Sequence, residues 1–94
     1  MITMNQETVD TLISFVKVVI MRKSDGNYHL IQAKLDSLYG SRLEDCASHP
    51  EYLRTVLKEA YHEKYDSIIQ EIKEQLGHLM EDKEIFEFFK IMEV

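Results

Sequence analysis

Hydrophobic residues recur along this chain at the spacing expected of amphipathic helices. The first stripe repeats every three or four residues and consists of Val9, Leu12, Ile13, Val16, Val19 and Ile20. Thr3 and Gln6 have the spacing of a capping box and predict where this helix begins. Phe15, Val18 and Met21 extend the apolar surface beyond one face. This helix is therefore expected to lie centrally in a bundle, with contact to a second chain as the alternative.

A second helix is predicted after the turn formed by residues 24–27. Asn27 suits its N-cap, and Gly40 suits its C-terminal end because glycine adopts the left-handed conformation without strain. The apolar side of this helix carries Tyr28, Ile31, Leu35, Leu38 and Tyr39. Residues 41–47 keep no long periodicity, so a loop or a short turn of helix around Leu43 is expected.

A long third helix is predicted from Ser48 to Gly77. Ser48 and Glu51 have capping-box spacing, and Pro50 is tolerated in a first helical turn. One side of the helix carries Leu53, Val56, Leu57, Ala60, Tyr61, Tyr65, Ile68, Ile72, Leu76 and Leu79. The run covers about 28 residues, twice the usual helix length, so a kink near Tyr65 is the alternative to a straight helix.

A last helix is predicted after Asp82, whose carboxylate suits an N-cap. Its core-facing stripe consists of Ile85, Phe88, Phe89 and Met92. Phe86 and Ile91 lie off this stripe and add apolar surface. This excess has two interpretations. The residues pack beneath the long third helix, or the chain self-associates through Phe86, Phe88, Phe89 and Ile91.

These patterns predict an all-α fold, an antiparallel bundle of four to five helices that forms a single domain over residues 1–94. The one cysteine, Cys46, cannot form an internal disulfide, and the first residues lack the basic start and apolar run of a secretion signal. A cytoplasmic location is therefore expected. The most apolar stretch, Leu12 to Met21, is shorter than the roughly 20 residues that a membrane-spanning helix needs, so no membrane association is expected.

Negative charge is concentrated in the C-terminal half of the chain. The formal net charge is −6, and residues 44–94 carry six Lys and Arg against thirteen Asp and Glu. Residues 1–43 are nearly balanced, with five against four. Nucleic acid binding requires clustered cations that neutralise phosphates, so nucleic acid is not an expected partner. A protein partner with a basic surface is favoured instead.

A row of polar residues is expected opposite the apolar side of the long third helix, at about 100° per residue. Its members are Glu59, Glu63, Asp66, Gln70 and Glu74. One interpretation is a solvated face that serves solubility. The other is a docking surface for a basic protein, with Tyr52, Tyr61 and Tyr65 as aromatic anchors at its borders. Tyr61 and Tyr65 are alternatively core residues whose hydroxyls reach the rim.

Catalytic and metal-binding patterns are incomplete. Glu59 and His62 have the spacing used in di-iron carboxylate bundles, but such sites need a second pair and further inward glutamates. The four histidines have no zinc-like spacing. Cys46 lies three residues before His49, where a helix dipole and an imidazole could lower its pKa. Its loop has no glycine for an oxyanion site, so an ordinary cysteine is favoured, and no metal, cofactor or enzymatic activity is expected.

In size, acidity and helical layout, the chain resembles the small all-helical immunity proteins of bacterial toxin systems, which block tRNA-cleaving colicins and contact-dependent growth inhibition toxins. The resemblance covers the layout of most of the chain and contains no diagnostic motif, so it transfers no individual residue. It implies a non-catalytic inhibitor that neutralises a basic toxin, for example a nuclease. The alternatives are a self-associating helical regulatory or assembly subunit, for example a homodimer, and a small metal- or thiol-dependent enzyme that uses Glu59, His62 or Cys46.

Overall fold

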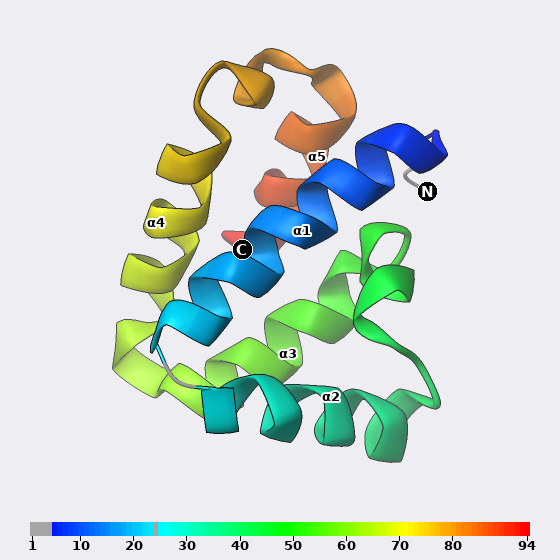
Figure 1. The fold of residues 1–94 in the computed structure, drawn as a ribbon, viewed down its shortest axis with the longest axis vertical. Coiled ribbons are helices and arrows are strands. Elements are labelled where there is room, and N and C mark those ends of the chain that lie inside the picture. The colour runs from blue at the N-terminus through cyan, green and yellow to red at the C-terminus, as the bar shows by residue number, and fades with distance from the viewer. Residues whose placement is uncertain (1–4, 24) are drawn as a thin grey trace.

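The computed structural model describes residues 5–23 and 25–94 (Figure 1). This part of the chain is helical and contains no strand, which confirms the predicted all-α helical bundle. The α-helices are α1 (Gln6–Lys23), α2 (Asp25–Tyr39), α3 (Pro50–Tyr61), α4 (Tyr65–Leu76) and α5 (Lys83–Met92). Three short 3₁₀ helices connect them: η1 (Leu43–Ala47), η2 (His62–Lys64) and η3 (Gly77–Glu81). None of the helices described is long and apolar enough to cross a membrane.

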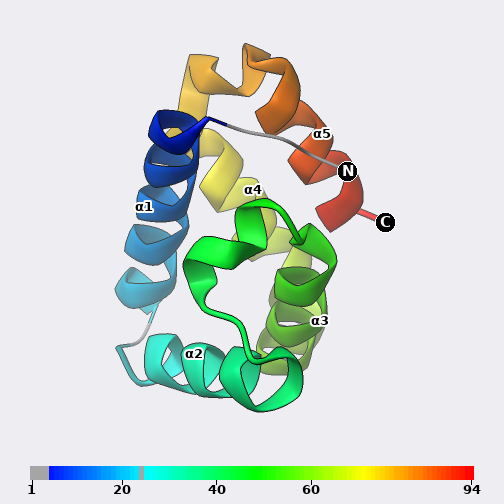
Figure 2. The same cartoon turned by 90° about the vertical axis from the view of Figure 1, so that its right-hand side faces the viewer.

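The helices surround one hydrophobic core. α1 packs against α2 and α4, and α3 packs against α2 and α5. Figures 1 and 2 show α2 crossing the lower end of the molecule, below α1 and α3. Each helix contributes one apolar stripe to a single buried cluster. An amphipathic helix can bury its apolar side only against other elements, so the helices pack around this cluster.

The predicted stripe of the first helix is the inner face of α1. Five of its members are buried and Val9 is half-buried against the same core. The wider apolar surface of α1 is only partly used, because Phe15 is half-buried while Val18 and Met21 remain 47% and 46% exposed. On α2, Leu38 is 54% exposed, so the predicted apolar side of this helix stops short of its C-terminal turn.

Several of the predicted helix ends are confirmed by the structure. Asp82 caps α5 as predicted, since its Oδ1 accepts the backbone N–H groups of Glu84 and Ile85 at 2.9 and 3.2 Å. Gly40 ends α2 as predicted, with a φ of 60°. Residues 43–47 form the short turn of helix expected around Leu43. A side chain such as that of Asp82 accepts the free backbone N–H groups of the first turn, and a glycine such as Gly40 adopts the positive φ that ends a helix. Both effects act within one turn.

Other predicted caps differ from the structure. Ser48 does not cap α3; His49 occupies the N-cap without a side-chain hydrogen bond, and Pro50 is the first helical residue. At α1, the Oδ1 atom of Asn5 accepts the backbone N–H of Thr8 at 2.8 Å, whereas the predicted cap Thr3 lies outside the described residues. α2 already begins at Asp25, two residues before its predicted cap.

The chain does not form one straight third helix, and the alternative of a kink near Tyr65 is closer to the structure, which breaks the helix at His62 and starts α4 at Tyr65. α3 ends at Tyr61, and the next residue, His62, has a left-handed φ of 49° with ψ of −119°. α4 begins after the short 3₁₀ turn and ends before Gly77, whose φ of 55° and ψ of −125° are nearly the same. The two breaks have one backbone geometry, but only the second has the glycine that suits it.

Polar side chains of α3 and α4 hold the end of α5. The Tyr65 hydroxyl donates a buried hydrogen bond to the Met92 carbonyl at 2.6 Å. The Arg54 guanidinium donates to the Ile91 carbonyl at 3.0 Å. These donors satisfy carbonyl groups that a helix leaves unpaired at its C-terminus, and the cation also opposes the negative end of the helix dipole.

Candidate functional site

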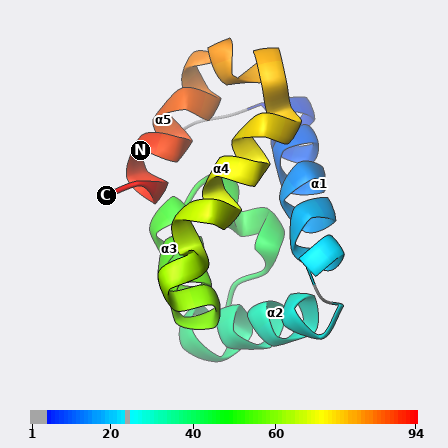
Figure 3. The ribbon, with the colours of Figure 1, turned by 90° about the vertical axis from the view of Figure 1, so that its left-hand side faces the viewer.

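The break at His62 divides the predicted row of acidic residues. Glu59 lies on α3, Glu63 lies in η2, and the remaining members lie on α4. We call Asp66, Gln70 and Glu74 the α4 acidic face, because they are exposed and follow one another at intervals of four residues. Figure 3 shows α4 on the outside of the molecule, beside α1.

Ion pairing further separates these carboxylates. Glu59 pairs with Lys34 of α2 at 3.8 Å, so its charge is partly compensated. Among the side chains described, Glu63, Asp66 and Glu74 form no ion pair. Within the predicted row, the unpaired negative charge therefore lies on η2 and the α4 acidic face rather than on α3.

The three predicted aromatic anchors differ in exposure and in surroundings. Tyr65 is a core residue that is only 4% exposed. Burial raises the pKa of its hydroxyl, and this hydroxyl donates its hydrogen bond to the Met92 carbonyl. Tyr65 therefore cannot be a docking anchor. Tyr61 is half-buried, and its hydroxyl oxygen is inaccessible to solvent. Of the two interpretations of these residues, the core one is right for Tyr65.

Tyr52 belongs to a different feature, an aromatic stack between α2 and the start of α3. Its ring lies between those of Tyr39 and His49, with centroid distances of 4.1 and 4.7 Å and nearly parallel planes. The sequence pattern does not reveal this stack, because it places Tyr39 on the apolar side of its helix, whereas the residue is 36% exposed. Helical spacing does not report on residues that meet across two helices.

The predicted self-association set does not form a surface. Phe88 and Phe89 are 0% and 2% exposed and meet edge to face inside the core, with centroids 5.1 Å apart. Ile91 is half-buried against the same cluster. Only Phe86, at 54%, is available to a partner. The packing interpretation, which concerned Phe86 and Ile91, is right for Ile91 and wrong for Phe86, while Phe88 and Phe89 are buried as the predicted core stripe requires.

The residues considered for chemistry are not assembled into a site. Glu59 and His62 are both exposed, on either side of the helix break. No group of three or more possible metal ligands occurs within the described side chains. Cys46 is fully buried, and this burial, with Asp45 and Glu44 nearby, raises the pKa of its thiol to about 12. The lowering by a helix dipole that was considered for this thiol does not occur, and the thiol is neutral at pH 7.

Among the hollows on the described surface, three differ in the charge of their lining. The first, of about 480 Å³, is bordered by Glu44, Asp45 and His49. The second, of about 190 Å³, is bordered by Glu7 and Asp82. The third, of about 510 Å³, is bordered by two lysines and no carboxylate. Sequence patterns do not reveal it, because its lining comes from four separate segments.

Comparisons of the chain with protein-family models, with curated proteins and with solved structures find no significant match. The function is therefore inferred from the arrangement of the side chains themselves. Two features carry chemical information: the exposed carboxylates of η2 and α4, and the lysine-lined hollow.

Proposed function

We propose that this protein binds a basic protein partner through Glu63 and the α4 acidic face. The observation that supports the proposal is a group of three exposed carboxylates, Glu63, Asp66 and Glu74, that form no ion pair with other described side chains. Other surface carboxylates do have cationic partners within the chain, as Glu59 has Lys34 and Glu71 has Lys23. A cationic partner would supply the missing counter-charges.

The proposed role is that of an inhibitor of the immunity type. A nuclease needs a cationic cleft for its phosphate substrate, and carboxylates on a helix can occupy such a cleft in place of phosphates. Opposite net charges also accelerate association, and this effect weakens as salt screens the field. The complex is therefore expected to form rapidly and to depend on ionic strength.

The test is a triple charge reversal, Glu63→Lys, Asp66→Lys and Glu74→Lys. The wild-type protein is used to capture partners from native lysate at low salt, and salt elution identifies the basic proteins released. Binding of each purified candidate is then measured against the triple variant. We expect the affinity to fall by at least about a hundredfold, since close charge pairs at interfaces couple by about 1.5 kcal/mol or more each.

The matched control reverses three carboxylates elsewhere, Asp36→Lys, Glu81→Lys and Glu87→Lys. All three are exposed, and they lie on α2, η3 and α5. The control has the same net charge as the test variant, so it separates local contact from long-range attraction. If both folded variants bind the partner equally well, the α4 acidic face is not the docking surface.

A further inference from the structure

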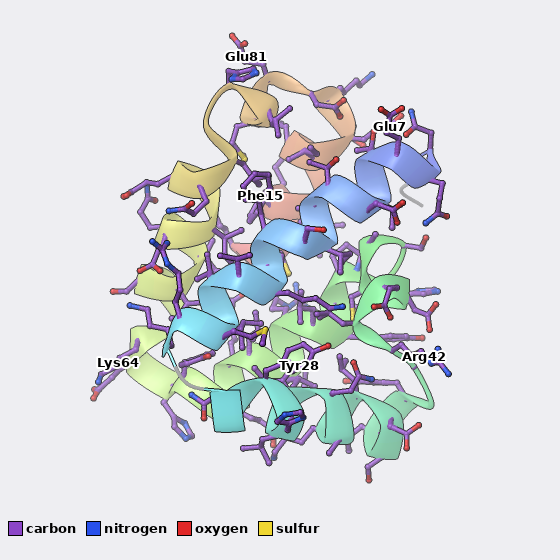
Figure 4. All side chains as sticks on the ribbon, viewed as in Figure 1. Glu7, Phe15, Tyr28, Arg42, Lys64 and Glu81 are labelled. Carbon is purple, nitrogen blue, oxygen red and sulfur yellow. The ribbon has the colours of Figure 1, made fainter. Side chains whose placement is uncertain are left out.

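The lysine-lined hollow lies between the end of α1, the first turn of α2 and the α3–α4 junction. Its lining includes Lys23, Asn27, Tyr61, Lys64, Ser67 and Ile68. Figure 4 shows Lys64 at the edge of the molecule, close to the end of α1 and the start of α2. A volume of about 510 Å³ falls within the range of small-molecule sites.

The charge of the hollow is opposite to that of the protein. The chain has a net charge of −6, yet Lys23 and Lys64 border this hollow without a lining carboxylate. Lys23 is paired with Glu71 at 3.0 Å, whereas Lys64 has no ion pair with the side chains that the structure describes. At least one ammonium group therefore remains available to an anion from solution.

The neutral groups of the lining suit the same kind of ligand. The amide of Asn27 and the hydroxyl of Ser67 add hydrogen-bond donors, and Ile68 adds apolar surface. The hydroxyl oxygen of Tyr61 is inaccessible to solvent. Burial raises the pKa of this hydroxyl, although the side chain of Asn27 and the charge of Lys23 lower it in part. The phenol is therefore neutral at pH 7 and does not cancel the positive charge of the lysines.

The backbone beside the hollow is strained. His62 is the one non-glycine residue with a positive φ in the described chain, and it lies between Tyr61 and η2, which carries Lys64. Such strain is typical of segments that position ligand-binding side chains. Here the left-handed turn redirects the chain so that residues 61, 64 and 67 border one hollow.

We propose that this hollow binds a small organic anion, with a carboxylate or phosphate group held between Lys23 and Lys64 and an apolar part against Tyr61 and Ile68. The site attracts the opposite charge to the proposed docking surface, although Lys64 and Ser67 alternate along the chain with Glu63 and Asp66. Occupancy by the anion would also join the end of α1 and Asn27 of α2 to the α3–α4 junction and would stabilise the fold by mass action.

The test uses phenyl phosphate as the probe, titrated into the full chain at low salt and followed by amide chemical shifts. We expect the largest changes at residues 23, 27, 61, 64 and 67. Lys64→Gln should weaken binding by about tenfold, since it replaces a charged hydrogen-bond donor to the anion by a neutral one. Shift changes spread evenly over the surface lysines would overturn the proposal.

Two controls make the result specific. Lys83→Gln and Lys90→Gln remove exposed lysines of α5 and should leave the affinity unchanged. Inorganic phosphate should bind about tenfold more weakly than phenyl phosphate, because it lacks the ring that would be buried on the apolar lining. Equal weakening by the Lys64 and α5 variants would show that only net charge matters and would refute the site.

Discussion

Replacing His62 by glycine is predicted to stabilise the protein. A non-glycine residue at φ 49° and ψ −119° is strained, because its Cβ atom crowds the adjacent backbone. The His62 side chain is exposed, so its removal sacrifices little packing. Gly77 adopts nearly the same φ and ψ at the end of α4 and shows that this backbone geometry suits glycine.

The magnitude follows from two opposing terms. Relief of the strained backbone contributes about 1–3 kcal/mol. The greater freedom of glycine in the unfolded chain costs about 0.5–1 kcal/mol. The net gain for His62→Gly is therefore about 0–2.5 kcal/mol, with about 1 kcal/mol from the middle of both ranges. Each kcal/mol raises the Tm of a domain of this size by about 4–8 °C.

Urea unfolding and thermal melts followed by circular dichroism measure this gain. His62→Ala is the control, because it removes the imidazole but keeps the Cβ atom and the strain, so a change within about 0.5 kcal/mol is expected. Gly77→Ala is the reverse experiment. A Cβ atom there would meet nothing within 4 Å, so its expected loss of about 1–2 kcal/mol is purely conformational.

A His62→Gly variant that melts no higher than His62→Ala would refute the proposed backbone strain at this position. That result would mean that the left-handed turn stores no strain at this residue. It would also remove the strain as support for the neighbouring hollow, while the lysines that line the hollow would still be testable by titration.

Further predictions concern the core. Tyr65→Phe should lose about 1–2 kcal/mol in urea unfolding, because the Met92 carbonyl loses its buried donor. Phe88→Ala should cost about 3–5 kcal/mol, whereas Phe86→Ala at an exposed position should cost about 0.5 kcal/mol or less. Cys46 should resist alkylation in the native protein and react after unfolding. Its thiol pKa rises from 9.0 to about 12 on folding. Stability should therefore fall as pH rises through this window, because only the unfolded chain releases the proton, and Cys46→Ala should remove this component.

Part of the fold follows from local signals alone. The three-and-four spacing of apolar residues identifies the inner face of α1 and the buried stripe of α5. Asp82 and Gly40 mark helix ends because their effect on the backbone acts within one turn. The excess of carboxylates after residue 43 is likewise a property of the sequence, and by itself it indicates the charge of the proposed partner.

The site was less predictable. The break at His62 leaves the apolar periodicity nearly intact, and histidine is not a turn signal, so a single helix is the natural interpretation of the sequence. That interpretation places Glu59 and Glu74 on one face, although they lie on separate helices. Sequence spacing places residues on a shared face only while one regular helix continues between them.

Tertiary packing decided which side chains are available. Neighbouring helices bury Phe89 and Tyr65, and packing around η1 encloses Cys46 and raises its pKa. Lys23 and Lys64 meet at one hollow only because the end of α1 lies beside the α3–α4 junction. A sequence pattern reports what each residue prefers within its own helix. Burial, ionisation and proximity depend on groups that are distant along the chain, and these are set only when the helices pack.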